Sequence, residues 1–106
     1  MLDLENIIGF EWDEGNKYKS EEKHNILQKE AEEIFINFPL LVSKSENKND
    51  EDRWMAYGKS NESKKLTLVF VVRDKKIRII SARPQSKKER KVYNEAEERI
   101  KANPGL

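Results

Sequence analysis

An arginine at the end of an apolar β-strand pattern is the residue of this chain best suited to phosphate chemistry. The pattern runs from Ile77 to Arg83 and carries Arg78 near its start. Arginine is planar, always charged and able to bind phosphate through two hydrogen bonds. When a nucleophile attacks a phosphate, cations of this kind stabilise the negative charge that develops there. Arg83 is the better candidate for this role because a basic helix start follows the strand end.

The two arginines are expected to lie apart. Side chains along a strand point alternately to its two faces, so Arg83 shares a face with Ile77 and Ile79, whereas Arg78 shares one with Ile80. We therefore expect Arg78 and Arg83 on opposite faces of a sheet, and they need not reach one site.

Glu89 and Tyr93 are four positions apart and so share one helix face. Either could move a proton in a reaction, and a tyrosine could also stack on a nucleic-acid base. Each has a structural alternative. Ser86 and Glu89 match a capping box, in which both side chains hydrogen-bond free backbone N–H groups. Tyr93 adjoins an apolar stripe, which favours a place in the core.

His24 is a candidate acid or base, because its unperturbed pKa lies near neutrality. Its alternative is a favourable cation in the last turn of a helix. Arg53 is a candidate phosphate contact, but it follows an acidic run at Asp50–Asp52 with which it could pair.

Positive charge is concentrated between Arg73 and Lys91. This segment contains nine Lys or Arg residues and two acidic residues, so its net charge is +7. The whole chain carries only +1, so the remainder is −6. Such polarity predicts a polyanion site on one face. Lys87 and Lys88 oppose the dipole at a helix start, which slightly favours a bound anion there.

Composition excludes several kinds of site. With no cysteine and one histidine, disulfides, thiolate zinc sites and multi-histidine metal sites are ruled out. Glu11 and Asp13 could bind Mg²⁺, although Asp13 is better explained as a helix N-cap. We expect no cofactor or metal. No apolar run reaches the roughly 18 residues that span a bilayer, and the start lacks a basic secretory signal, so a cytoplasmic protein without membrane contact is expected.

The first half of the chain alternates strand and helix signals. We expect a strand over 7–12, a surface helix from Asp13 to His24 with Asn25 in the left-handed position after it, and a helix over 27–37 with a buried stripe. Pro39 ends that helix. A short strand over 40–42 and a polar loop over 43–52 follow.

The second half predicts three strands joined by short turns. They cover 53–58, 66–72 and 77–83; the middle one is apolar on both faces and is expected to be central. A helix runs from Ser86 to about Lys101. The order β-α-α-β-β-β-β-α predicts a single α+β domain over 1–106, with its core over about 8–94 and helices packed on one face of an antiparallel sheet.

Three blocks of residues form a recognisable pattern: Phe10–Asp13 with Lys23, His24, Ile26, Glu30 and Ala31; Asp52–Arg53 with Gly58; and Arg73, Ile77–Arg83, Glu89–Arg90 and Tyr93. In these blocks the sequence resembles the BrnT toxins of bacterial type II toxin–antitoxin systems. It departs from the usual family residues at Asn16, Ser20 and Val71, where polar groups are lost or moved.

The resemblance implies a RelE-like fold, RNA cleavage and a ribbon-helix-helix antitoxin of the BrnA type. It further implies a heterotetramer of two toxins on an antitoxin dimer, which binds operator DNA through the antitoxin. Together with the reasoning above, it gives two sets of candidates. The catalytic candidates are Arg83, Glu89, Arg90, Tyr93 and His24, and the RNA-binding candidates are Arg53, Arg73, Arg78, Lys87 and Lys88.

Three functions are compatible with these features. The first is an endoribonuclease toxin that needs no metal and inhibits translation and growth. The second is a non-catalytic partner that occupies an antitoxin and modulates operator binding. The third is an unrelated RNA-binding domain. The basic segment suits all three, because phosphate binding alone would require it.

Overall fold

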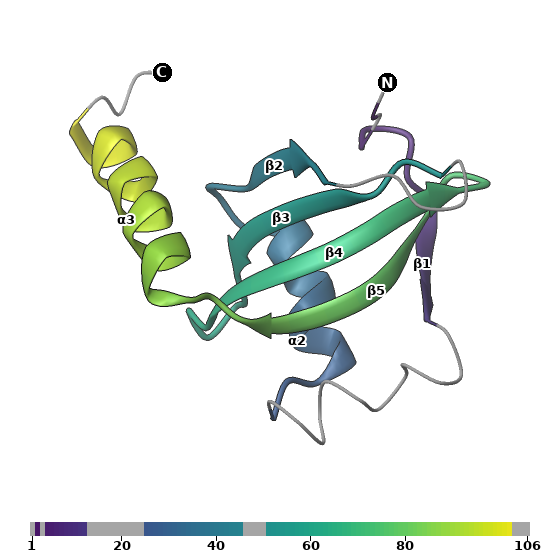
Figure 1. The fold of residues 1–106 in the computed structure, drawn as a ribbon, viewed down its shortest axis with the longest axis horizontal. Coiled ribbons are helices and arrows are strands. Elements are labelled where there is room, and N and C mark those ends of the chain that lie inside the picture. Colours follow the sequence, from purple (N-terminus) through teal and green to yellow (C-terminus); the bar gives the residue numbers. More distant parts are fainter. Residues whose placement is uncertain (1, 3, 13–24, 46–50, 103–106) are drawn as a thin grey trace.

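A computed structural model of the chain describes residues 2, 4–12, 25–45 and 51–102 (Figure 1). Its elements follow the predicted order, except that the expected helix from Asp13 to His24 lies outside the described residues. They are β1 (Gly9–Trp12), α2 (Gln28–Glu33), the 3₁₀ helix η1 (Ile34–Ile36), β2 (Leu41–Lys44), β3 (Trp54–Lys59), β4 (Lys65–Arg73), β5 (Lys76–Pro84) and α3 (Lys87–Ala102).

The five strands form one mixed sheet in the order β1-β5-β4-β3-β2. Strands β2 to β5 pair antiparallel, as predicted. The expectation of a wholly antiparallel sheet is wrong, because β1 pairs with β5 in parallel. Short connections force their strands to run antiparallel. No turn joins β1 to β5, so the sequence pattern could not predict which strand β1 pairs with or whether the pairing is parallel.

A two-residue turn closes the β4–β5 hairpin. Arg73 pairs with Lys76, and the intervening Asp74 and Lys75 have φ values of 52° and 61°. Two successive left-handed residues are the signature of the tight turn that matches strand twist. The predicted hairpin is confirmed. Asn25, also predicted to be left-handed, has φ 56°.

A β-bulge in β5 changes which side chains share a face. Val69 pairs with Ser81 but Phe70 pairs with Ile79, so Ile80 has no partner of its own. The extra residue shifts the alternation by one position. Arg78 is therefore opposite Val71 and Arg83 opposite Thr67. Since Val71 and Thr67 are four positions apart on β4, the two arginines share a face, and the prediction of opposite faces is wrong.

The main core lies between the sheet and α2. The predicted stripe is confirmed at Ala31 and Ile34, both fully buried, but it is wrong at Phe38, which follows the helix and is 70% exposed. Gly58 of β3 brings the backbone close to η1: a Cβ added there would meet Ile34 Cβ at 2.7 Å. Partners from the sheet include Ala56, Leu66, Leu68, Phe70, Ile77, Ile79 and Ala82.

The last helix lies on the other face of the sheet. Lys59, Lys65 and Thr67 alternate with the core residues on β3 and β4, so their side chains point away from α2. They bind α3: Lys59 and Lys65 pair with Glu97, and Thr67 donates to Glu89. The prediction that helices cover one face is therefore wrong. Because β4 is apolar on both faces, both faces need cover, and α3 supplies it at one end only (Figure 1).

Among the described residues, none of the helices combines the length and apolar character needed to cross a bilayer.

The predicted loop over 43–52 starts later than expected. Strand β2 extends to Lys44, and the backbone N–H of Ser45 still donates to the Arg53 carbonyl at 2.7 Å.

Candidate active site at one end of the open face

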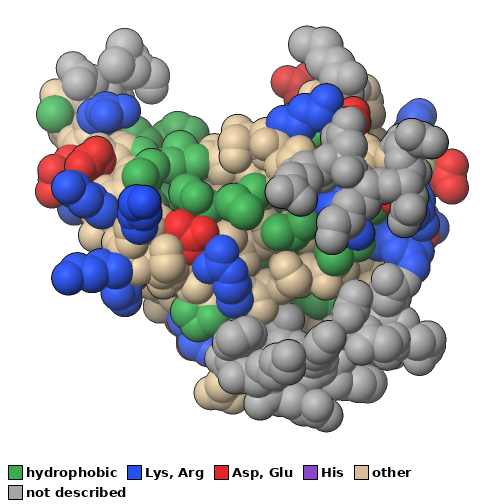
Figure 2. Space-filling model, in the orientation of Figure 1, with side chains coloured by type: hydrophobic (Ala, Val, Ile, Leu, Met, Phe, Trp, Pro, Cys, Tyr) green, Lys and Arg blue, Asp and Glu red, His purple; other side chains and the backbone are tan. Residues whose placement is uncertain are grey.

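The open face is the sheet surface opposite α2 that α3 leaves uncovered. Its strand pairings form three lateral rows. Figure 2 views this face and shows apolar side chains across its middle, with basic side chains toward both ends. The row nearest α3 holds Tyr57, Thr67 and Arg83, and the middle row holds Met55, Val69 and Ser81. The far row holds Val71 and its partner Arg78, and Arg53 extends it because Arg53 directly precedes Trp54, the partner of Phe70.

Arg83 is held by Glu89 in an end-on ion pair. Its Nη1 donates to Oε1 of Glu89 at 2.6 Å, and its Nη2 donates to Oε2 at 2.8 Å. Nη1 also reaches the Pro84 carbonyl at 3.3 Å. These bonds use the terminal edge of the guanidinium. The side edge, formed by Nε and Nη2, has no hydrogen-bond partner among the described residues, and the side chain is 40% exposed.

Glu89 is the more buried member of the pair, with 12% of its side chain exposed. Besides Arg83, its Oε1 accepts hydrogen bonds from the Ser86 backbone N–H at 2.8 Å and the Thr67 hydroxyl at 3.0 Å. The Ser86 hydroxyl in turn accepts from the Glu89 N–H at 3.2 Å. The predicted capping box is confirmed. Glu89 thus starts the helix and fixes the arginine at the same time.

These bonds make Glu89 a weak base. The hydrogen bonds from Arg83, followed by those from Ser86 and Thr67, lower the pKa of Glu89 to about 2 although burial opposes them. The same pairing raises the pKa of Arg83. At neutral pH a carboxylate with so low a pKa rarely takes a proton. Its position suits anchoring of Arg83 better than general base catalysis.

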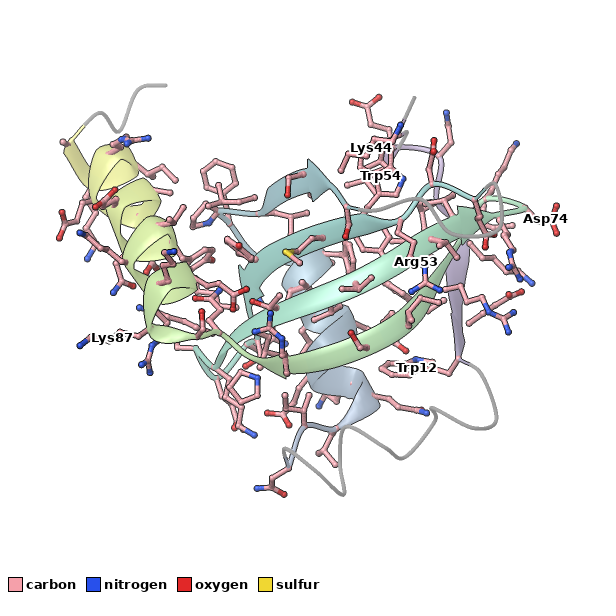
Figure 3. The ribbon with its side chains drawn as sticks, in the orientation of Figure 1. Trp12, Lys44, Arg53, Trp54, Asp74 and Lys87 are labelled. Carbon is pink, nitrogen blue, oxygen red and sulfur yellow. The ribbon has the colours of Figure 1, made fainter. Side chains whose placement is uncertain are left out.

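A separate arginine group lies in the far row and just beyond it. Arg73 forms a two-bond pair with Glu51, one of whose contacts is Nη2 to Oε2 at 2.7 Å. Arg78 Nη1 lies 3.6 Å from Glu11 Oε2. The basic segment from Arg73 to Lys91 is therefore divided between two ends of one face. Figure 3 shows Arg53 over the sheet and Lys87 far from it at the base of α3.

Comparison with known proteins identifies the family. The family described as the ribonuclease toxin BrnT of type II toxin–antitoxin systems matches residues 12–89, which is most of the chain. This chain belongs to the BrnT family. The matched region includes both Arg83 and Glu89. A type II toxin family implies an antitoxin partner for its members.

A crystal structure of the Brucella abortus ribonuclease toxin BrnT, determined at 1.1 Å, has a similar fold, with a TM-score of 0.55. The two sequences are 24% identical over 76% of this chain and 99% of that one. At this identity the likeness shows the fold alone. No curated protein matches the sequence. The more general RelE-like description of the fold stays a prediction.

Tyr93 lies inside this BrnT-family fold. Its side chain is fully buried, and its hydroxyl donates to the Pro39 carbonyl at 2.7 Å. Burial raises the pKa of Tyr93 to about 12, with a smaller contribution from Glu97. These observations agree with the alternative that Tyr93 is a core residue. Its side chain does not lie on the open face with Arg83.

Some of the remaining catalytic and RNA-binding candidates lie within the described residues and others lie outside them. Lys87, Lys88 and Arg90 are exposed in the first turn of α3. His24 and Asp13 lie outside the described residues. Within the described ranges, no three His, Cys, Asp or Glu residues come together in a way that could hold a metal ion.

Two residues beside Arg83 were not among the sequence candidates. Thr67 bonds to Glu89, and Tyr57 lies next to Thr67 in the same lateral row. The negative charge of the Tyr57 phenolate form adds a minor contribution to the raised pKa of Arg83. Alternation along the predicted strand over 53–58 places Tyr57 on the face of Arg53, but only the register between strands reveals its nearness to Arg83.

Proposed function

We propose that this chain is a metal-independent endoribonuclease that cleaves RNA on the open face and thereby inhibits translation and growth. Membership in a ribonuclease toxin family supports the general activity. The observation that carries the site is the geometry of Arg83. Glu89 fixes its terminal edge by two hydrogen bonds, while the Nε–Nη2 edge remains available to a phosphate.

The proposed reaction joins the 2′-oxygen to phosphorus and breaks the bond from phosphorus to the 5′-oxygen. A base takes the 2′-hydroxyl proton, and an acid gives a proton to the departing oxygen. Arg83 stabilises the added negative charge on the phosphorane, and Glu89 keeps the guanidinium in place. The products are a 2′,3′-cyclic phosphate and a 5′-hydroxyl.

For the proton transfers, Tyr57 and His24 are the proposed groups. Tyr57 is half-buried in the row of Arg83, and its hydroxyl can both donate and accept a hydrogen bond. His24 is proposed from the family resemblance and the pKa of an imidazole. Arg90, together with Lys87 and Lys88 on the first turn of α3, would add positive charge beside the scissile phosphate.

The test is cleavage of RNA by the purified protein in EDTA. The wild type should produce fragments with 2′,3′-cyclic phosphate ends, and Arg83→Ala should not, because a strand-end arginine can be removed without opening the core. Lys29→Ala is the matched control, since Lys29 is an exposed cation on α2. Wild-type cleavage only after Mg²⁺ addition, or full activity of Arg83→Ala, would refute the proposal.

Growth provides the cellular test. Induced expression of the wild type alone should arrest growth and degrade RNA, whereas Arg83→Ala should permit growth. If the chain does not cleave RNA but binds its antitoxin, the non-catalytic role in operator control would replace the proposed one.

We further propose that a ribbon-helix-helix antitoxin of the BrnA type covers the basic α3 end of the open face in the cytoplasm. Two toxins would bind one antitoxin dimer, and the antitoxin would contact the DNA. The support is the family and the cluster of cations in the first turn of α3. In the complex, Lys87, Lys88 and Lys91 should be protected from amine modification and RNA cleavage should stop. Unchanged lysine reactivity would show that inhibition works elsewhere.

A further inference from the structure

The far row of the open face carries two arginines that have no role in the cleavage proposed at Arg83. Arg53 directly precedes Trp54, the partner of Phe70, so it stands beside Val71, and Arg78 pairs with Val71 from the other side. Two arginines thus flank one apolar residue. Building on the proposed function, we infer that Arg53 and Arg78 form a second phosphate-contact site, which binds the RNA backbone several nucleotides from the cleaved bond.

The bulge at Ile80 is what makes this possible. With regular alternation, Arg78 and Arg83 would point to opposite faces. The register shift between Val69 and Phe70 places both arginines on the open face. Burial agrees with this orientation, because Ile77, Ile79 and Ala82 are buried on the α2 side while Arg78 and Arg83 are partly exposed. Bulges are used in this way to redirect side chains near functional sites.

The two sites are too far apart for one phosphate. Arg78 and Arg83 are separated by five positions, one of them absorbed by the bulge. At roughly 3.3 Å per strand residue, their backbones are about 13 to 15 Å apart. The middle row between them, Met55, Val69 and Ser81, carries no charge. A phosphate on Arg83 therefore leaves the far row empty, whereas a longer strand reaches both.

Charge at the far row also favours a polyanion. Four cations lie in or next to the far row, Arg53, Arg73, Lys76 and Arg78, and the carboxylates near them include Glu11, Glu51 and Asp74. Glu51 engages Arg73 through two hydrogen bonds. Glu11 lies 3.6 Å from both Lys76 and Arg78, beyond ordinary hydrogen-bond length. An RNA phosphate forms bidentate bonds with arginine and can therefore compete with Glu11 for these cations.

The experiment compares RNA oligonucleotides of increasing length. For the wild type, kcat/KM should rise with length and then level off. Arg53→Gln/Arg78→Gln should lose that rise, by about tenfold on the longest RNA, yet match the wild type on the shortest RNA that is cleaved. Equal cleavage of the shortest RNA also shows that the variant is folded. The matched control is Lys29→Gln/Lys101→Gln, which changes two exposed cations on α2 and in the last turn of α3, outside the three rows.

Binding gives a readout that does not depend on catalysis. With 2′-O-methyl RNA of the same sequences, the logarithmic salt slope of the double variant should be smaller by about 1.4, since each single-strand phosphate contact contributes about 0.7. Glu11→Gln should strengthen binding of the long RNA and leave the short RNA unaffected, because it removes a competing carboxylate.

The outcomes separate this inference from the proposed function. If the wild type cleaves no RNA, the proposed function fails, and the salt slope alone decides the far row. If the wild type cleaves but Arg53→Gln/Arg78→Gln keeps the full length dependence and salt slope, the inference is overturned. Unchanged RNA kinetics with weakened antitoxin binding would likewise overturn it and assign the far row to the protein partner.

Discussion

The hydroxyl of Tyr93 donates a 2.7 Å hydrogen bond to the carbonyl oxygen of Pro39, 54 positions earlier in the chain. Both residues are buried. The bond joins α3 to the segment that leads into β2, and so fixes the helix against one end of the sheet. Since Ser86, Glu89 and the basic first turn belong to the same helix, Tyr93 positions the end of α3 that carries the candidate site from inside the protein.

Tyr93→Phe should therefore affect stability rather than chemistry. It removes the donor and leaves a buried carbonyl unpaired, which should lower the free energy of unfolding by about 1 to 2 kcal/mol. RNA cleavage at 25 °C should stay within about threefold of the wild type. Urea unfolding followed by single-turnover cleavage makes the comparison. A large loss of cleavage at unchanged stability would instead mean that Tyr93 acts in the reaction.

Glu89→Gln tests the anchoring of Arg83. Glutamine can still cap the helix at this position, but a neutral amide cannot accept two charge-assisted bonds from the guanidinium. RNA cleavage should fall by at least about tenfold, mainly in kcat, because Arg83 is no longer held at the phosphate. Glu95→Gln, an exposed change on the same helix, is the control and should behave as the wild type. If both variants cleave equally well, the anchoring role is wrong.

The same residue predicts how stability depends on pH. The pKa of Glu89 is lowered to about 2, chiefly by its hydrogen bonds to Arg83, so the unfolded chain binds its proton more tightly than the folded one. Its contribution is complete above the unfolded pKa near 4.5 and is lost as pH falls toward 2. Because the Arg83 side is open to solvent, we expect about 1 to 2 kcal/mol.

Unfolding curves between pH 7 and pH 2 check this expectation. The stability difference between the wild type and Glu89→Gln should be constant above about pH 5 and should shrink as the carboxylate is protonated. A difference that stays constant down to pH 2 would show that the Arg83–Glu89 pair adds nothing to the folded state.

Local patterns were enough to predict most elements. The capping box at Ser86 and Glu89, the turn before Lys76 and the buried stripe ending in Ile34 all depend on residues close in sequence, whose spacing fixes the structure. What the sequence left open depends on contacts between distant segments. The parallel pairing of β1 with β5 and the position of α3 on the second face are both decided by which apolar surfaces remain to be covered.

The candidate site shows the same division. Arg83 and Glu89 were identified from the strand end and the family resemblance, yet their pairing was not foreseen. Tyr57 and Thr67 join them only through the lateral register of β3, β4 and β5. The bulge at Ile80 has no marker such as glycine or proline, so alternation alone placed Arg83 on the core face with Ile77 and Ile79, which is wrong.

Gly58 provides a test of how closely the sheet approaches η1. A methyl group at this position would lie 2.7 Å from Ile34 Cβ and 3.2 Å from its Cδ1. The first contact is to an atom fixed to the backbone of η1, so the 3₁₀ helix itself must move. Gly58→Ala should destabilise the protein by about 1 to 3 kcal/mol through overpacking, which would appear as a lower midpoint in thermal unfolding.

The matched control is Gly9→Ala. Gly9 also lies in a strand, but an added Cβ there has nothing within 4 Å. Alanine in place of a strand glycine restricts the unfolded chain and should leave stability unchanged or raise it by up to about 1 kcal/mol. Opposite signs for the two variants would attribute the loss to Ile34. If both lower the midpoint equally, the cause is the sheet backbone, and the close approach of β3 to η1 does not limit packing.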